Sequence, residues 1–283
     1  MIAIFNFKTR RVLSVFLAAI FCLPIASKAE QPPAYIIKTI VLDAGHGGHD
    51  SGAKGSESLE KNIALEVVLK LGKAIEKQIP GVRVIYTRKV DVFVPLYKRI
   101  ELANDNKADL FVSIHCNAAG VTSSRYKNSR GRYVTTTSSN RSAKGTETLV
   151  SGSGRLGEQD AAVRENASML LEENYKDNYQ GFDPKDPESY IIFSLMKNQY
   201  RDQSIKLANA MQQEYTNSNR VNRGVWEKSL AVLARAGMPA VLTEIGFISN
   251  YEEERMMMSE EGQDQIVQNL VNALKNYKKS VEK

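Results

Sequence analysis

The sequence predicts a single α/β domain in which a twisted, mainly parallel β-sheet carries helices on both faces. Short β-rich apolar runs alternate with longer segments whose apolar residues recur at helical spacing, as in β-α-β units. The composition, 42% hydrophobic and 25% charged in 283 residues, is that of a folded globular chain. We therefore expect residues 36–283 to form one domain.

The first half of this domain is predicted to hold three strands and two helices. The run at residues 36–42 ends in a glycine-dense turn and reads as the first strand. Residues 59–79 carry an apolar residue at every fourth position, which predicts an amphipathic helix, and Pro80 and Gly81 end it. A strand at 82–87, a helix at 96–106 and a strand at 109–115 follow.

The second half repeats this alternation after a long interruption. Strands are expected at 146–150 and 240–244, and helices at 204–216 and 262–281. Residues 120–200 are interpreted as an insertion over one face of the sheet, and long insertions in compact domains are usually functional. Within it, residues 121–144 are rich in Ser, Thr, Lys and Arg and lack acids, which predicts a mobile, solvated loop. The composition of residues 158–179 predicts an acidic helix, and we expect this helix to have a regulatory role.

The first 29 residues have the pattern of an export signal. Basic residues precede an apolar run of 15 residues, Val12 to Ala26, and small residues follow at Ser27 and Ala29. The run is shorter than the ~20 residues that span a bilayer, and it contains Pro24. We expect cleavage after Ala29, a short linker at 30–35, no stable membrane anchor, and a mature protein in the periplasm or outside the cell.

Net charge gives no indication of a nucleic-acid partner, and the cysteine content excludes a disulfide bond in the mature chain. Of the formal charge of +6, four units belong to the signal segment, and the small remainder does not predict a nucleic-acid partner. Cleavage would remove Cys22 and leave Cys116 as the one thiol, so an intramolecular disulfide is excluded in the mature chain.

Three of the predicted strands are followed at their carboxyl ends by a polar side chain. His46, His115 and Glu244 each follow the apolar residues of a strand, and the carboxyl ends of parallel strands open onto one crevice. Glu60 begins the first helix, a short loop away from His46. Two imidazoles and a carboxylate suit Zn²⁺ with one position left open. A lone histidine at a strand end is more often a packed or capping residue than a ligand, and Glu60 is favourable with the helix dipole. Glu244 amid apolar residues instead asks for a partner or a metal, and the prediction rests on the convergence of all four.

Three ordered motifs carry a family resemblance. LDAGHGGHDSGAKG at 42–55, SIHCNA at 113–118 and LTEIGFISN at 242–250 resemble the zinc-dependent N-acetylmuramoyl-L-alanine amidases, the type-3 amidase family of cell-wall hydrolases. The resemblance extends over residues 36–280. It implies hydrolysis of the amide bond between N-acetylmuramic acid and L-alanine in peptidoglycan, for cell-wall remodelling or daughter-cell separation.

The resemblance also implies roles for single residues. Zinc would be held by His46, Glu60 and His115, with Glu244 as the catalytic acid and base. Three further positions match the family pattern near the substrate or behind the ligands, and they are Asn117, Arg88 and Arg99. Two other functions stay open: an inactive peptidoglycan-binding or regulatory protein on the same fold, and a zinc peptidase acting on the stem peptide itself.

The insertion resembles a regulatory segment. Some periplasmic members of the family carry a helix here that blocks the zinc through a glutamate, and Arg164-Glu165-Asn166 matches that region. A helix over Gln159–Asn174 would bring Glu165 to the metal and hold the enzyme inactive until a protein activator displaces it. The alternative is that Arg164 and Glu165 are structural.

Overall fold

The structure is a computed structural model that describes residues 35–127, 132–152, 159–194 and 199–282. Residues 35–283 form one compact unit. The predicted signal segment and its cleavage site lie outside the described residues. No helix in the described part of the chain is both long and apolar enough to span a bilayer.

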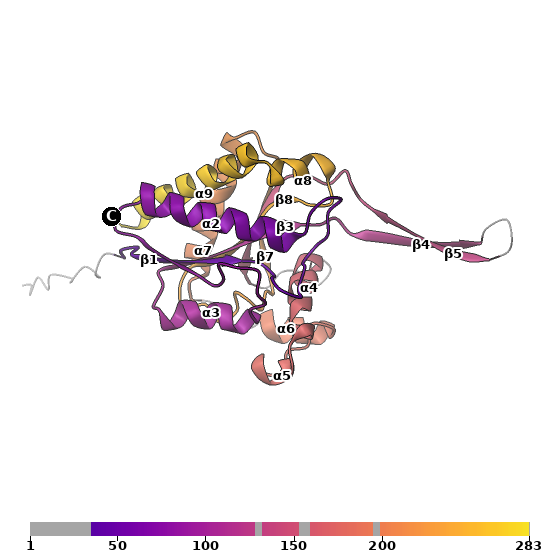
Figure 1. The fold of residues 1–283 in the computed structure, drawn as a ribbon. Coiled ribbons are helices and arrows are strands. Elements are labelled where there is room, and N and C mark those ends of the chain that lie inside the picture. Colours follow the sequence, from indigo (N-terminus) through magenta and orange to yellow (C-terminus); the bar gives the residue numbers. More distant parts are fainter. Residues whose placement is uncertain (1–34, 128–131, 153–158, 195–198, 283) are drawn as a thin grey trace, which may run out of the picture. The chain divides into compact units, whose positions relative to one another are not determined.

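A six-stranded mixed sheet forms the centre of the fold (Figure 1), in the order β2-β1-β3-β8-β6-β7. Every neighbouring pair is parallel except β6 and β8, which run antiparallel. The predicted mainly parallel α/β fold is therefore confirmed. The strands are β1 (Thr39–Ala44), β2 (Arg83–Tyr86), β3 (Leu110–Asn117), β6 (Thr146–Ser151), β7 (Asn222–Lys228) and β8 (Ala240–Phe247).

Helices cover both faces of this sheet, and each face has its own apolar core. Figure 1 shows α2 (Glu60–Gln78) and α9 (Glu260–Val281) over one face and α3 (Leu96–Asp105) over the other. The α2 stripe predicted from the sequence is buried, and α7 (Arg201–Asn217) completes the same core. The hydroxyl of Ser259 accepts the backbone N–H of Gly262 and caps α9.

The side chains of successive strand residues alternate between the two cores. On β3, Val112 and Ile114 face the α2 core, whereas Phe111 faces the α3 core. On β8, Val241 faces the α2 core and Leu242 the α3 core. By this alternation His115 and Glu244 share the α3 face, which is also the face that the insertion packs against.

Two expectations for the insertion were wrong. Residues 121–144 do not form a loop, because β4 (Val121–Lys127) and β5 (Tyr133–Ser139) pair as an antiparallel hairpin. Thr, Tyr and Val favour strands even where no apolar alternation is present. The helix expected over 158–179 is broken into α4 (Asp160–Asn166), the 3-10 helix η3 (Ala167–Leu171) and α5 (Tyr175–Asn178), and α6 (Pro187–Ser194) follows.

Two residues between η3 and α5 have backbone conformations that an α-helix does not accommodate. Glu172 is extended, and Asn174 is left-handed with φ of 55°. The structure also contains two elements that the sequence did not predict, β7 and the short helix α8 (Tyr251–Met258). The amide side chain of Asn250 caps α8 by accepting two backbone N–H groups.

A buried ion pair joins β1 to α3. One oxygen of the fully buried Asp43 carboxylate accepts Nη1 of Arg99 at 2.8 Å, and the hydroxyls of Thr87 and Ser113 donate to the carboxylate at 2.6 Å each. Burial alone would raise the pKa of Asp43, but Arg99 and the two hydroxyls outweigh burial and lower it. The carboxylate is therefore charged inside the fold.

We predict that Arg99→Met destabilises the protein by about 3–5 kcal/mol, because it leaves the Asp43 charge buried without its cation. Urea unfolding near neutral pH measures this loss. Arg83→Met, at an exposed arginine on β2, is the control and should stay within about 0.5 kcal/mol of wild type. Equal stability of the Arg99 and Arg83 variants would contradict the prediction.

Candidate metal centre

The turn after β1 holds His46 in an uncommon backbone conformation. His46 has φ of 58°, and two buried arginines bind the carbonyls around it. Arg99 donates to the His46 carbonyl at 2.8 Å, and Arg88 donates to the Gly45 carbonyl at 2.7 Å. A Cβ at Gly45 would lie 2.5 Å from the His115 ring, so only glycine lets the turn pack this closely. The backbone thus brings the two imidazoles together.

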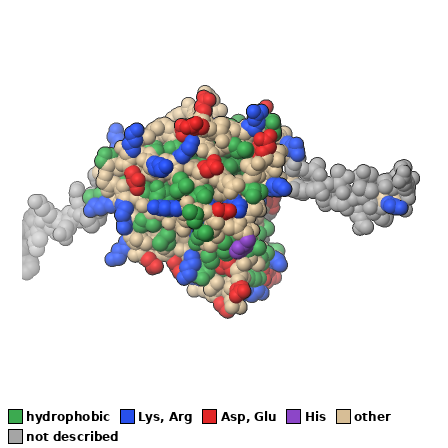
Figure 2. Space-filling view, viewed as in Figure 1, with side chains coloured by type: hydrophobic (Ala, Val, Ile, Leu, Met, Phe, Trp, Pro, Cys, Tyr) green, Lys and Arg blue, Asp and Glu red, His purple; other side chains and the backbone are tan. Residues whose placement is uncertain are grey.

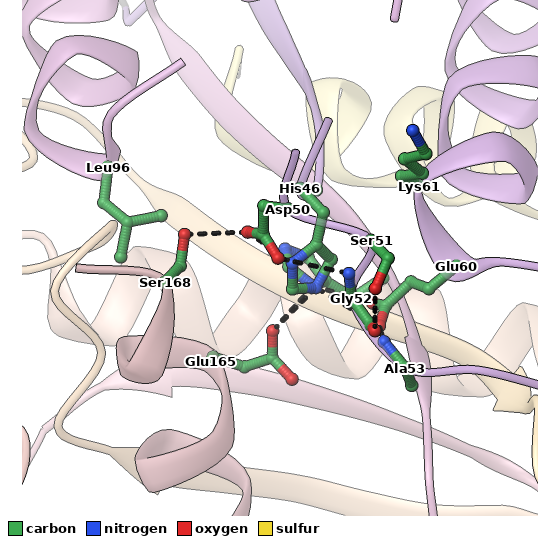
Figure 3. A network of polar contacts seen from close by, with 12 residues as sticks. His46, Asp50, Ser51, Gly52, Ala53, Glu60, Lys61, Leu96, Glu165 and Ser168 are labelled. Carbon is green, nitrogen blue, oxygen red and sulfur yellow. Dashed lines mark hydrogen bonds and ion pairs between the residues drawn. The ribbon is translucent and has the colours of Figure 1, made fainter. Parts of the chain in front are cut away.

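Four buried side chains converge next to this turn (Figure 3). His46 comes from the turn, Glu60 from the start of α2 and His115 from β3, as the sequence predicted. Glu165 reaches the same point from α4. One ligand atom from each of the four lies within 4.8 Å of all the others.

The interatomic distances fit a zinc ion. His46 Nε2 lies 3.2 Å from Glu60 Oε2, and His115 Nδ1 lies 3.0 Å from Glu60 Oε1. Glu165 Oε2 lies 2.9 Å from His115 Nδ1 and 3.4 Å from His46 Nε2. Zinc ligands at about 2.1 Å in a tetrahedron are separated by about 3.4 Å, close to these values. Among the described residues, His46 Nε2 and Glu165 Oε2 have no hydrogen-bond partner, as metal ligands would.

The charges of the cluster are balanced within it. Burial disfavours the charge on Glu60, but the facing His46 and His115 outweigh burial and lower its pKa to about 2. Burial also opposes the charge on the imidazoles, yet the facing carboxylates raise the pKa of both histidines. Without a metal, protonated histidines neutralise the carboxylates of the cluster. A bound divalent cation would supply this positive charge instead.

Asp50 supports the cluster from behind, and the sequence analysis missed it. Its Oδ2 lies 2.9 Å from His46 Nδ1 and also accepts the hydroxyl of Ser168 at 2.8 Å (Figure 3). A carboxylate on the far nitrogen of a metal-binding histidine fixes its tautomer and ring orientation. The only signal in the sequence was an acid four residues after His46, and its role depends on the fold of the turn.

Glu244 lies beside the cluster and not within it. The register of β3 and β8 pairs it with His115, and it is fully buried. Neither of its carboxylate oxygens has a hydrogen-bond partner among the described residues, and Arg164 Nη2 lies 3.5 Å from Oε1. Burial and the nearby Glu165 charge raise the pKa of Glu244. The carboxylate is therefore a strong proton acceptor next to the metal position.

Comparison with known proteins identifies the family. The family model described as N-acetylmuramoyl-L-alanine amidase, Amidase_3, matches residues 40–276. The chain belongs to this family.

Two amidases and an uncharacterized protein, YqiI, are similar to most of the chain. The amidase AmiC of Escherichia coli O6:H1 is 30% identical over 243 residues, which are 84% of this chain and 52% of that protein. The chain thus spans about half the length of AmiC. YqiI of Bacillus subtilis is 29% identical over 94% of this chain and 96% of its own length. The catalytic domain of CwlV, an amidase from Bacillus (Paenibacillus) polymyxa, superposes with a TM-score of 0.59 at 27% identity, covering 87% of this chain and 99% of that one.

Arg164 links the insertion to the rest of this amidase-family site. Its guanidinium donates to Glu165 Oε1, to Asn117 Oδ1 and to the Ala118 carbonyl, each at 3.1 Å. Asn117 therefore lies at the edge of the centre and binds the insertion. The adjacent residues Arg164 and Glu165 thus contact Glu244 and the metal cluster, respectively.

Four other residues near the centre contribute no ligand atom to the cluster. Arg88 and Arg99 are 3% and 1% exposed and bind carbonyls of the His46 turn, so they hold the turn in place. His49 is exposed and its ring lies against Phe93. Cys116 packs in the α2 core, and its backbone N–H donates to Glu60 Oε1 at 2.9 Å.

We predict that Asp50→Asn lowers zinc affinity about 10- to 100-fold, because the His46 ring loses the carboxylate that orients it. Competition with a chromogenic chelator on the purified protein measures the affinity. Asp105→Asn, at an exposed aspartate that ends α3, is the control and should bind zinc like wild type. An unchanged affinity in Asp50→Asn would rule out this supporting role.

Proposed function

We propose that this chain is an active zinc-dependent amidase that hydrolyses the bond between N-acetylmuramic acid and L-alanine in peptidoglycan. The observation that carries the proposal is the buried set of His46, Glu60 and His115 with the buried carboxylate of Glu244 beside it, which has no hydrogen-bond partner among the described residues. An inactive wall-binding relative would have no need to keep a carboxyl group buried at this position without hydrogen bonds.

His46, Glu60 and His115 would hold the zinc, with Asp50 fixing the ring of His46. When bound, zinc polarises the scissile carbonyl and lowers the pKa of a water molecule. Glu60 is placed to serve as a ligand because its two oxygens face different histidines at 3.2 and 3.0 Å. The facing histidines lower the pKa of Glu60 against the effect of burial, which favours the ionised form that binds a metal.

Glu244 would move the proton. It takes a proton from the attacking water while the water oxygen bonds to the carbonyl carbon, and it returns the proton to the alanine nitrogen as the C–N bond breaks. Its raised pKa, caused by burial and by neighbouring acids, favours this transfer in both directions. The products are a free lactyl carboxylate and a stem peptide beginning with L-alanine.

The cell wall is where such an enzyme acts, in wall remodelling or daughter-cell separation. The export pattern of residues 1–29 is consistent with a periplasmic or extracellular site of action. Because AmiC is about twice as long as the region it shares with this chain, these assignments are proposals for the present chain alone.

Glu165 is proposed to act as an inhibitor within the chain. It offers the cluster a fourth ligand atom at the position that a water or the substrate carbonyl must occupy during hydrolysis. Arg164 pairs with Glu244 at the same time. A protein activator that displaces α4 would remove both contacts together and open the site.

We predict that Glu244→Gln lowers the release of stem peptides from purified sacculi about 10²- to 10⁴-fold, because the general base is lost. About one zinc per chain should remain bound. Glu76→Gln, at an exposed glutamate on α2, is the matched control and should keep full activity.

Product analysis by mass spectrometry separates amidase from peptidase action, since only the amidase leaves intact stem peptides. Both Glu244→Gln and its control are made in the wild type and in a Glu165→Ala background, so that inhibition by the insertion does not hide the result. Zinc-loaded protein that releases no stem peptide in either background would contradict the proposed activity.

We predict that Glu165→Ala raises the activity of the purified protein about tenfold or more without any partner. The substitution removes the side chain that occupies the metal position, so a larger fraction of the molecules can bind substrate. Initial rates on labelled sacculi measure the change. Glu173→Ala, at an exposed glutamate in the same insertion, is the control and should leave the rate unchanged. If both variants hydrolyse the wall at the wild-type rate, Glu165 does not inhibit.

A further inference from the structure

A groove of about 1270 Å³ lies directly beside the metal centre. Three of its lining residues also contact the centre. Ala53 donates its backbone N–H to Glu60 Oε2 at 2.8 Å, and Asn117 is bonded to Arg164. The groove is therefore the space next to the scissile bond.

The lining of the groove is predominantly basic. Five basic side chains line it against two acidic ones, Glu147 and Asp160. The basic residues are Lys54, Arg141, Arg164, Arg223 and Lys228. On the face of the molecule shown in Figure 2, by contrast, both signs of charge are interspersed. The concentration of positive charge in one groove indicates an anionic ligand.

Arg223 is the best-positioned cation of this groove. Its Nε bonds to Glu147 Oε1 at 2.5 Å, and its guanidinium lies 4.9 Å from the centre of the Phe247 ring. The side chain is still 41% exposed. These contacts fix the plane of the guanidinium and, among the described residues, engage only Nε, so both terminal nitrogens can bind a carboxylate in bidentate fashion.

The backbone around Arg223 is fixed as well. The indole Nε1 of Trp226 donates to the Arg223 carbonyl at 2.9 Å, and the Gly224 N–H donates to Asn222 Oδ1 at 2.8 Å. Gly224 has φ of 98°, a conformation that favours glycine. Arg223 is therefore held on an ordered strand end, which lowers the entropy that binding must overcome.

The strand register gives the distance from Arg223 to Glu244, the proposed catalytic residue. Glu244 on β8 pairs with Glu147 on β6, and Arg223 on the next strand, β7, bonds to Glu147. Two strand spacings of roughly 4.8 Å separate Arg223 from Glu244 by about 10 Å. An extended peptide covers this distance in about three residues, at ~3.3–3.6 Å per residue.

We propose that Arg223 is a specificity residue that binds a free carboxylate on the second or third residue of the stem peptide. The inference rests on the proposed function, since it assumes that L-alanine lies at the metal centre. The anionic part of the substrate beyond the cleaved bond is the peptide, so the basic groove takes the peptide and not the glycan. Arg223 thereby favours peptides with free carboxylates over those whose carboxylates are amidated.

The experiment compares two muramyl tripeptides that differ only in the second and third residues, which carry free carboxylates in one and carboxamides in the other. Wild type and Glu165→Ala protein should cleave the free-acid form with a kcat/KM about tenfold higher, the effect of one charge-assisted bidentate contact. Arg223→Gln should bring that ratio close to unity. Arg223→Lys should retain part of it.

Arg83→Gln is the matched control, because Arg83 is an exposed arginine on β2, the opposite edge of the same sheet. It should leave the ratio unchanged. A wild-type ratio near unity, or an unchanged ratio in Arg223→Gln, overturns the assignment while the amidase activity itself stands.

A binding measurement decides the inference independently of catalysis. Titration calorimetry of the released free-acid tripeptide into the full chain should show about tenfold weaker binding to Arg223→Gln than to wild type or Arg83→Gln. If no substrate is cleaved in any background, the proposed activity fails and this titration still decides the role of Arg223. Equal binding to all three proteins overturns that role.

Discussion

The buried charge pair between Asp43 and Arg99 is the contact on which the rest of the structure depends. Asp43 is fully buried on a central strand and needs a cation inside the fold. Arg99 supplies it, and the guanidinium also donates to three backbone carbonyls, those of Val94, Ala44 and His46. Arg99 therefore neutralises the buried charge of Asp43 and also fixes the turn that presents His46. A substitution of Arg99 changes both the stability of the protein and the geometry of the metal centre.

The two-residue alternation of strands decides which side of the sheet carries the chemistry. His115 and Glu244 lie on the same face as Phe111 and Leu242, and that face is covered by α3 and the insertion rather than by α2 and α9. The insertion packs on this face and therefore lies over the metal centre unless it is displaced. The proposed control of access by α4 would need only a local displacement of this helix and no long-range conformational change.

The sequence predicted the parts that depend on periodicity and strand ends. The α2 stripe and the apolar strands were found, and His46, Glu60 and His115 converge because parallel strands end at one edge. Strand β7 was missed because NRGVWEK is a half-exposed edge strand without alternating apolar residues. Asp50 and Arg223 were missed for another reason: their partners are 4 and 76 residues away, and only the folded turn and the β6–β7 ladder bring them into contact.

The contacts that hold the insertion on the centre suit reversible inhibition. Asn166 bonds to the Ser229 carbonyl and the Ala231 N–H at 2.8 Å each, and Ser168 bonds to Asp50. Glu165 adds the contact to the histidines. Polar contacts of this kind contribute roughly 0.5–1.5 kcal/mol each, and water replaces most of them when they open. On α4 itself, Ala162 is buried in the α3 core and Ala161 packs against it, so a partner that displaces α4 has to compensate small apolar contacts and a sum of modest polar terms.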